Sequence, residues 1–295
     1  MEITAKMVKD LRESTGAGMM DCKCALVDSC GDMEKAVDIL RTKGLAALAK
    51  KAGRATDEGI ISGWTSDAAD VGAMIEINCE TDFVARNSDF QSFGAQLASH
   101  VGISAPTDVS QMLEQPFLGG GETVERTLGE MVGRVGENIT ISRFARYALS
   151  SNHGAISVYI HGIGNIGVLL EVSCSSSEAT EAASFKELGR NLAMQIAATA
   201  PVAVSRDEIS QEIVEHELTI YKAQAAESGK PVEIQEKMAV GRIEKFYKEV
   251  ALLEQIYVKD DSMTVEQYVK SVAKELGAEA SIVRFERFAL GGGRN

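Results

Sequence analysis

Residues 59–79 read GIISGWTSDAADVGAMIEINC, and residues 154–174 read GAISVYIHGIGNIGVLLEVSC, 95 positions further along the chain. Both stretches begin with glycine, end with cysteine and consist of two apolar runs around a short turn. Such runs, rich in β-branched residues, predict two antiparallel strands joined as a hairpin. Because similarity at a fixed offset indicates an internal repeat, we expect the fold to be a duplication of one structural unit.

The repeat extends well beyond the two hairpins. At the same offset Phe90 matches Phe185, and at an offset of 141 the run ISRFARYAL from Ile141 matches IVRFERFAL from Ile282. The pattern of each copy therefore predicts the order strand, turn, strand, helix, helix and strand. This is an α+β unit with a three-stranded antiparallel sheet and helices packed on one face. The larger second offset means that the second copy carries about 46 additional residues.

The additional residues have a helical pattern. Over residues 205–258, apolar residues such as Ile213 and Val240 recur at spacings of three and four, in two runs separated by a Gly-Lys-Pro turn at 229–231. This pattern predicts an antiparallel helical hairpin of the coiled-coil type. A hairpin inserted between elements of a repeat projects from the body, so its outer face is a candidate surface for a partner or for a homodimer.

Residues 1–54 contain three short periodic segments bounded by capping residues. Thr4 and Asp32 are suited to begin the first and third helices, because their side chains can accept hydrogen bonds from free backbone N–H groups. Gly16 is suited to end the first helix, and we expect Gly44 to end the third. These signals predict a small three-helix domain, followed by a short helix and a linker.

The sequence thus predicts four parts. In chain order they are an N-terminal helical domain (1–54), core subdomain N (55–150), core subdomain C (151–204 and 259–295) and, inserted in the latter, a helical hairpin (205–258). We refer to subdomain N as the first copy of the duplicated unit and to subdomain C as the second copy.

The composition is acidic, with 30 Lys and Arg against 43 Asp and Glu and a net charge of −13. A protein that wraps a phosphate backbone needs a basic face, so the charge indicates protein partners and no direct binding of nucleic acid. No apolar run approaches the roughly 20 residues of a membrane span. The charged N-terminal segment also lacks the apolar centre of a secretory signal. We therefore expect no membrane association and a cytoplasmic location.

The cysteines are odd in number and suggest reduced thiols. Cys22, Cys24 and Cys30 are close enough to suggest a zinc site, but no histidine or fourth cysteine follows at a ligand spacing. The histidines show no recognisable nucleophile setting either. We expect no metal and no catalytic residue.

Residues 162–167, GIGNIG, match the GxGxxG pattern of dinucleotide-binding proteins. That match would indicate a nucleotide-cofactor-binding oxidoreductase, which needs a helix directly after Gly167 so that the helix N-terminus meets the pyrophosphate. The next residues, VLLEVSC, are typical of a strand. We therefore expect a hairpin turn and no cofactor, and we keep the oxidoreductase as the alternative.

The turn at residues 81–84, Thr-Asp-Phe-Val, places a large aromatic side chain beside an acid at the end of a predicted strand. Turns usually contain small polar residues. Phe83 could pack beneath the following helix together with Phe90, or it could stay exposed for a partner. In the second copy the aligned residues 176–178 are Ser-Ser-Glu. Because a phenylalanine that the fold requires should occur in both copies, this difference favours a role in binding.

Three segments resemble the signatures of bacterial elongation factor Ts: LRESTGAGMMDCK at 11–23, EINCETDFVAR at 76–86 and SGKP at 228–231. The resemblance covers essentially the whole chain, in order. It implies a guanine nucleotide exchange factor for the translational GTPase elongation factor Tu, acting by protein–protein binding and not as an enzyme. It also implies a ubiquitin-associated-like N-terminal domain, a core of two subdomains and a coiled-coil insertion.

The resemblance further implies which residues contact the GTPase. The turn of the first copy would enter the GTPase domain beside its magnesium site, with Phe83 as a wedge and Asp82 disturbing the magnesium shell. The implied contact residues are Thr81, Asp82, Phe83 and Val84 in this turn, and Arg12, Met19 and Met20 in the N-terminal domain. The second copy and the hairpin would lie against other parts of the partner. A competing hypothesis is a passive adaptor that uses only residues 1–54 and does not need Phe83.

Overall fold

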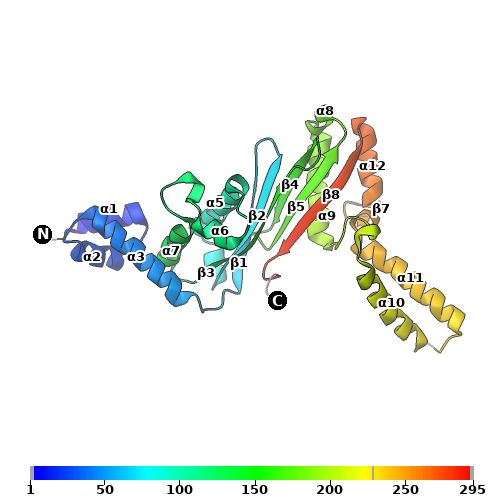
Figure 1. The fold of residues 1–295 in the computed structure, drawn as a ribbon, viewed down its shortest axis with the longest axis horizontal. Helices are drawn as coiled ribbons and strands as arrows, with labels where there is room; N and C mark the ends of the chain where they lie inside the picture. Colours follow the sequence, from blue (N-terminus) through cyan, green and yellow to red (C-terminus); the bar gives the residue numbers. More distant parts are fainter. Residues whose placement is uncertain (1–2, 228, 293–295) are drawn as a thin grey trace.

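The structure, a computed structural model, describes residues 3–227 and 229–292 of the chain. Figure 1 shows an elongated molecule with a small group of helices at one end and a helical hairpin at the other. Two sheets lie between them, and helices cover their outer sides. None of the helices within these described ranges is long and apolar enough to cross a membrane.

The two predicted three-stranded antiparallel sheets are both present, which confirms the α+β fold class. The strand order is β1-β2-β3 in the first copy and β4-β5-β8 in the second, so the second strand of each hairpin is central. Each central strand has one irregularity against the third strand, between Glu76 and Ile77 and between Glu171 and Val172. The bounds are β1 (Glu58–Thr65), β2 (Val71–Cys79), β3 (Ile139–Ala148), β4 (Gly154–His161), β5 (Ile166–Cys174) and β8 (Ala280–Ala289).

Helices pack on the outer face of each sheet. Phe90 on α5 and Phe185 on α9 occupy matching places and are both buried, which fits their match in the sequence repeat. The helices of the first copy are α4 (Asp82–Ala85), α5 (Ser88–Ser104), α6 (Val109–Glu114) and α7 (Val124–Val135), with the 3₁₀ turn η1 (Phe117–Gly119). Those of the second copy are α8 (Ser177–Thr180), α9 (Ala183–Thr199) and α12 (Val265–Leu276).

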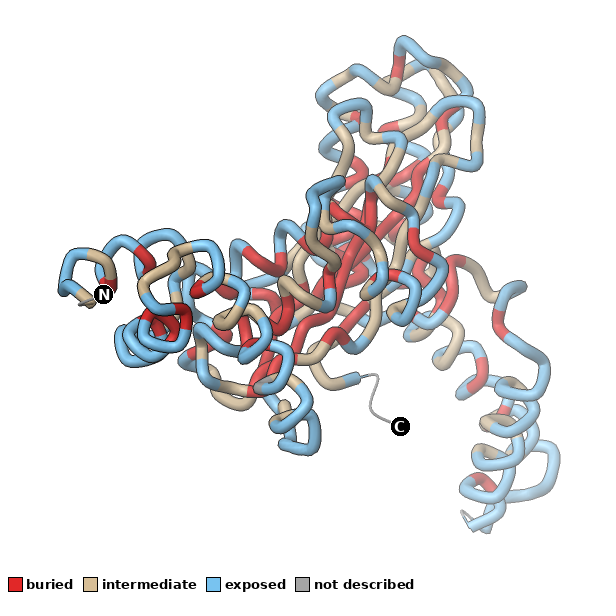
Figure 2. The backbone as a smooth tube through the Cα atoms, turned by 60° about the vertical axis from the view of Figure 1, so that its left-hand side comes forward, coloured by how far each residue is buried: buried red, intermediate tan, exposed pale blue. Residues whose placement is uncertain are grey.

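The inner faces of the two sheets pack against each other through one apolar cluster, which contains Ile61 and Met74 of the first copy and Ile156 and Leu169 of the second. These residues are themselves related by the offset of 95, so the interface has two-fold-like symmetry. Figure 2 shows the buried residues concentrated along these central strands, whereas the hairpin and the N-terminal helices are largely exposed. Burial of this shared face joins the two copies into one body.

Two arginines cross between the copies in the same way. Arg143 on β3 lies over the ring of Phe288, and Arg284 on β8 lies over the ring of Tyr147, each 4.1 Å from the ring centroid. Each guanidinium also donates to a buried carboxylate of its own sheet at 2.8 Å. These carboxylates are Glu76 for Arg143 and Glu171 for Arg284.

The N-terminal domain contains α1 (Ala5–Thr15), α2 (Met19–Asp28) and α3 (Met33–Lys51). Thr4 and Asp32 cap α1 and α3 as predicted, and Gly16 ends α1 with a φ of 67°. The prediction that Gly44 ends the third helix is wrong, because α3 continues to Lys51 as one helix of 19 residues. At Gly44 this helix crosses α7 so closely that a Cβ atom would lie 2.9 Å from the carbonyl oxygen of Gly129.

The predicted helical hairpin is present as α10 (Gln211–Ala226) and α11 (Val232–Val250). Ile213 and Val240, whose spacing helped to predict it, are exposed and do not lie in the seam between the helices. Ser228, from the third signature, lies outside the described residues. Around the base of the hairpin are elements that the sequence did not predict: η2 (Arg206–Glu208), η3 (Leu252–Glu254) and a small sheet of β6 (Ile256–Tyr257) and β7 (Asp260–Thr264).

Candidate functional site

Phe83 lies on the surface at the start of α4, a helix of four residues that directly follows β2. Its side chain is 82 % exposed, the largest value among the exposed large apolar residues of the described chain. The interpretation that Phe83 packs beneath the next helix with Phe90 is therefore wrong, because Phe90 is buried and Phe83 is not. An apolar ring held in water is an available source of binding free energy.

The residues around Phe83 anchor the turn in the core. Val84 and Ala85 are buried in the apolar cluster of the first copy. Thr81 caps α4, because its hydroxyl oxygen accepts from the backbone N–H of Val84. Asp82 is half exposed and lies 3.6 Å from Arg86, so its carboxylate faces solvent beside Phe83. The turn thus presents one acid and one aromatic ring on an anchored base.

The thiol of Cys79 supports the same turn from the end of β2. Burial raises the pKa of Cys79 to about 12, and the negative charge of Glu137 is the second cause. The thiol therefore stays protonated, and it donates to the carbonyl oxygen of Thr81 at 3.2 Å. This contact fixes the direction of the chain as it enters α4.

Arg12, Met19 and Met20 are all exposed, and they lie near the connection between α1 and α2. The helix α2 directs Cys22, Ala25 and Leu26 into the core of the small domain, so Met20 falls on its outer side. The exposed Val27 lies on the same helix and was not predicted as part of this surface. The sequence could have shown this, because on a helix Val27 faces away from the side formed by Cys22, Ala25 and Leu26.

The structure does not bring the two predicted groups of residues into direct contact, but Arg134 on α7 links the segments that carry them. Its guanidinium donates to the carbonyl oxygen of Thr15 at 3.4 Å and lies 3.9 Å from the carboxylate of Asp89. Thr15 ends α1, and Asp89 is in the first turn of α5, the helix that follows the Phe83 turn. This link therefore helps to define the orientation of the N-terminal domain on the first copy.

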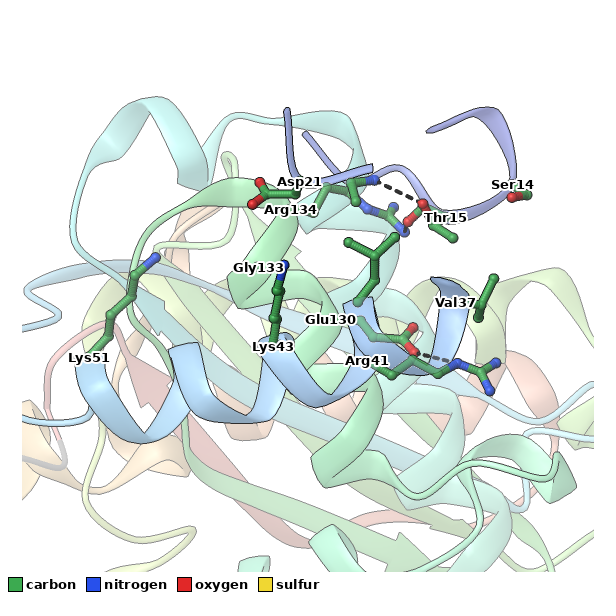
Figure 3. Close-up of a pocket in the computed structure, with 13 residues that line it drawn as sticks. Ser14, Thr15, Asp21, Val37, Arg41, Lys43, Lys51, Glu130, Gly133 and Arg134 are labelled. Atoms are coloured by element: carbon green, nitrogen blue, oxygen red, sulfur yellow. Dashed lines mark hydrogen bonds and ion pairs between the residues drawn. The ribbon is translucent and has the colours of Figure 1, made fainter. Parts of the chain in front are cut away.

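A cavity of about 320 Å³ lies beside this link, between the N-terminal domain and α7. Figure 3 shows Asp21 and Arg134 close together on one side of it and Lys43 and Lys51 of α3 on the other, with Glu130 paired to Arg41 of the same helix. Its charges are mixed in sign. Among the described residues there is no group of three or more His, Cys, Asp or Glu side chains that could hold a metal ion.

The GxGxxG segment is a hairpin turn between β4 and β5, and a strand follows Gly167. The oxidoreductase alternative is therefore wrong, since the residues after Gly167 belong to β5 and do not form the helix whose N-terminus would bind a pyrophosphate. Gly164, with a φ of 110°, instead accepts a hydrogen bond from the N–H of Ile61 at 2.7 Å. The glycines of this turn allow it to lie against the first strand of the other copy.

Comparison with known proteins points to a single family. A family model described as "Elongation factor TS" matches residues 80–292, which include the Phe83 turn. Curated proteins named "Elongation factor Ts" are similar over nearly the whole chain. That of Clostridium kluyveri is 46% identical over 292 residues, that of Trichlorobacter lovleyi 45% over 294 and that of Syntrophotalea carbinolica 47% over 293. In each case the match covers 99% of this chain and 94% of the relative.

Proposed function

The chain belongs to the elongation factor Ts family, and from this premise we propose that it is a guanine nucleotide exchange factor for elongation factor Tu. In this proposal the protein promotes release of GDP during polypeptide elongation by binding the GTPase, without catalysing a bond-forming step. The observation that carries the proposal is the exposed ring of Phe83 on a turn whose next residues are buried in the core.

The proposed mechanism acts on the magnesium and phosphate site of the GTPase. GDP in such proteins is held by backbone N–H groups around its phosphates and by Mg²⁺, which requires nearly ideal octahedral geometry. When Phe83 enters beside this site, a small displacement of the segments that position the ion is enough to weaken its binding. The carboxylate of Asp82 then stands beside the magnesium shell and disturbs it further.

The free energy gained by burying Phe83 limits how far this residue alone can weaken the binding of GDP. Burying a phenylalanine contributes roughly 1.5–3 kcal/mol. Each tenfold weakening of GDP affinity requires about 1.4 kcal/mol of coupling free energy. Phe83 alone therefore accounts for about one to two powers of ten, and other contacts must supply the remainder. We assign these further contacts to Arg12, Met19 and Met20 of the N-terminal domain, which would bind the same GTPase domain.

The second copy and the hairpin would contact other parts of the partner. Several apolar side chains on the hairpin are exposed, namely Ile213, Ile220, Val232, Ile234 and Val240. They form the proposed surface for a further contact with the GTPase or for a homodimer, and sedimentation of the free protein distinguishes the two. The net charge of −13 fits a protein partner better than a nucleic acid, and the site of action would be the cytoplasm.

The test is release of labelled GDP from elongation factor Tu. We expect the unmutated protein to accelerate release and Phe83→Ala to lose most of the acceleration. The matched control is Glu178→Ala, which changes the exposed residue at the aligned position of the second copy and should leave the rate unchanged. An unmutated protein without effect would contradict exchange activity. Undiminished acceleration by Phe83→Ala would contradict the wedge role of Phe83 alone and leave the exchange activity standing.

A further inference from the structure

One carboxylate binds the residues that directly precede the Phe83 turn. Glu137, between α7 and β3, accepts hydrogen bonds through Oε2 from the backbone N–H groups of Glu80 at 3.1 Å and Thr81 at 3.0 Å. Its Oε1 accepts from the hydroxyl of Thr81 at 2.6 Å. Hydrogen bonds to an ionised acceptor are stronger than neutral ones. Three of them therefore converge on the two residues that directly precede Asp82.

The segment around Glu137 is held in return by the carboxylate of Glu80, and this second contact restricts the motion of both segments. The carboxylate of Glu80 accepts from the backbone N–H of Asn138 at 2.6 Å and lies 3.2 Å from Nη1 of Arg54. The side-chain amide of Asn138 in turn donates to the carbonyl oxygen of Arg54 at 2.9 Å. Residues 80–81 and 137–138 thus hold each other, and together with the Cys79 thiol they fix the N–H, hydroxyl and carbonyl groups of Thr81.

The second copy closes the equivalent turn without a carboxylate. The position aligned with Glu137 is Ala278, and the residue aligned with Glu80 is Ser175. There the N–H of Ser175 donates to the carbonyl oxygen of Glu279, and the N–H of Glu279 donates to the hydroxyl of Ser175, both at 2.9 Å. Since two neutral hydrogen bonds suffice to connect the strand to the helix, the fold itself does not require Glu137.

A wedge must resist displacement, and a helix of four residues is too short to be rigid by itself. Any freedom of the turn would have to be lost when Phe83 enters the partner, which would subtract from the available binding free energy. We propose that Glu137 is a positioning residue that holds the Asp82–Phe83 turn in its binding conformation before the partner arrives. This inference rests on the proposed exchange function of Phe83.

The test measures GDP release from elongation factor Tu over a range of concentrations of this protein. We expect Glu137→Ala to lower the maximal rate by roughly tenfold, because a misplacement of about 1 Å can cost on the order of 10²-fold. The concentration at half-maximal rate should change less, since the N-terminal contacts remain. Glu137→Gln should be intermediate, because its amide oxygen can still accept from both N–H groups and its NH₂ can donate to Thr81.

The matched control is Glu279→Gln, which removes the same charge in the second copy. Glu279 is exposed, and only its backbone holds the turn there, so we expect an unchanged rate. Hydrogen exchange supplies a second measurement: the amides of residues 80 and 81 should exchange faster in Glu137→Ala than in the unmutated protein. If Glu137→Ala does not fold, the Glu137→Gln variant carries both measurements.

A double-mutant cycle with Phe83→Ala decides whether Glu137 acts through the ring. If it does, Glu137→Ala has little further effect on the maximal rate once Phe83 is absent. Independent, multiplying losses would overturn the inference, as would a normal rate in Glu137→Ala while Phe83→Ala is impaired. No acceleration by the unmutated protein would overturn the proposed function itself, and the positioning role with it.

Discussion

The two copies of the duplicated unit are most alike where they touch each other and least alike where they face outward. Arg143 and Arg284 cross the shared interface in the same way, each stacked on an aromatic ring of the opposite copy. The turns after the central strands differ, with exposed Phe83 in one copy and Glu178 in the other. The scaffold is thus common to both copies, and the features proposed to bind the partner are present in one.

The outer helices show a second difference of the same kind. Gly129 and Gly133 on α7 lie against Gly44 of the N-terminal domain, whereas the aligned residues of α12 are Lys270 and Lys274, both exposed. A pair of glycines lets another helix approach closely, and a pair of lysines keeps a surface in water. The N-terminal domain therefore packs on the first copy, the same one that carries Phe83.

The largest expected effect tests the shared part of the comparison. Arg284→Ala leaves the buried carboxylate of Glu171 without its arginine, and Arg143→Ala does the same to Glu76. Breaking a buried pair by removing one partner costs about 3 kcal/mol or more. We expect both variants to lose about 3 kcal/mol of unfolding free energy in urea.

The control for this pair is Arg190→Ala on the exposed side of α9, which should change the unfolding free energy by no more than about 0.5 kcal/mol. Strongly unequal losses for Arg143→Ala and Arg284→Ala would contradict the two-fold-like role that the geometry assigns to them.

Most of the scaffold could be predicted from the sequence because its signals are local or repeated. The hairpin strands follow from alternation and turns, and the caps at Thr4 and Asp32 act within one helical turn. Gly44 does not follow such a local signal, because glycine there permits the close crossing with Gly129 on another helix. A local rule cannot distinguish a glycine that ends a helix from one that lets two helices approach.

The site could be predicted only in part. The difference between the two turns indicated a role for Phe83, but its exposure depends on how the turn packs, and two packings fitted the sequence. The contact between Thr81 and Glu137 spans 56 residues and depends on the positions of β2 and β3 in the sheet. Such a contact leaves no periodic signal in a single sequence.

Exchanging the turns tests directly whether they are the functional difference between the two copies. The triple variant T81S/D82S/F83E gives the first copy the turn sequence of the second. We expect the exchange rate to fall by about 10- to 100-fold, the range that burial of one phenylalanine supports. The unfolding free energy should change by less than about 1 kcal/mol, because these are surface positions above an unchanged core.

Labelled GDP release and urea unfolding of the same preparation of T81S/D82S/F83E check both parts. Retained exchange would show that the turn is not the functional difference between the copies. A large loss of unfolding free energy would show that the fold of the first copy does depend on its own turn sequence.

The contact of the N-terminal domain gives a smaller effect. Gly129→Lys places the residue of the second copy at the crossing with α3, where a Cβ atom already lies 3.3 Å from the backbone at Gly44. Overpacking of this kind costs roughly 1–3 kcal/mol. We expect the N-terminal domain to separate from α7 while the sheets stay folded, with a larger radius of gyration by X-ray scattering.

Gly241→Lys is the matched control, because nothing lies within 4 Å of a Cβ atom at that position of α11. It should leave the radius of gyration unchanged. An unaltered radius in Gly129→Lys would mean that the two glycines of α7 are not what docks the domain on the first copy.

The smallest expected effect concerns pH and the buried carboxylate of the second copy. Burial alone would raise the pKa of Glu171, but hydrogen bonds from Ser150 and the charged Arg284 hold it below the ordinary value of 4.5. A carboxyl group whose pKa is lower in the folded than in the unfolded protein adds stability above the unfolded value. That contribution is lost as the pH falls from about 4.5 through the folded pKa.

Glu171→Gln removes this contribution at every pH. The unfolding free energies of the variant and the unmutated protein should therefore differ at pH 7 and approach each other as the pH falls from about 4.5 through the folded pKa, below which the unmutated carboxyl is neutral as well. Urea unfolding at several pH values measures this, with the exposed Glu178→Gln as the control. A gap that stays constant on acidification would mean that Glu171 contributes through its shape and packing. The interface between the copies would then depend on arginine stacking more than on the charge of its buried acids.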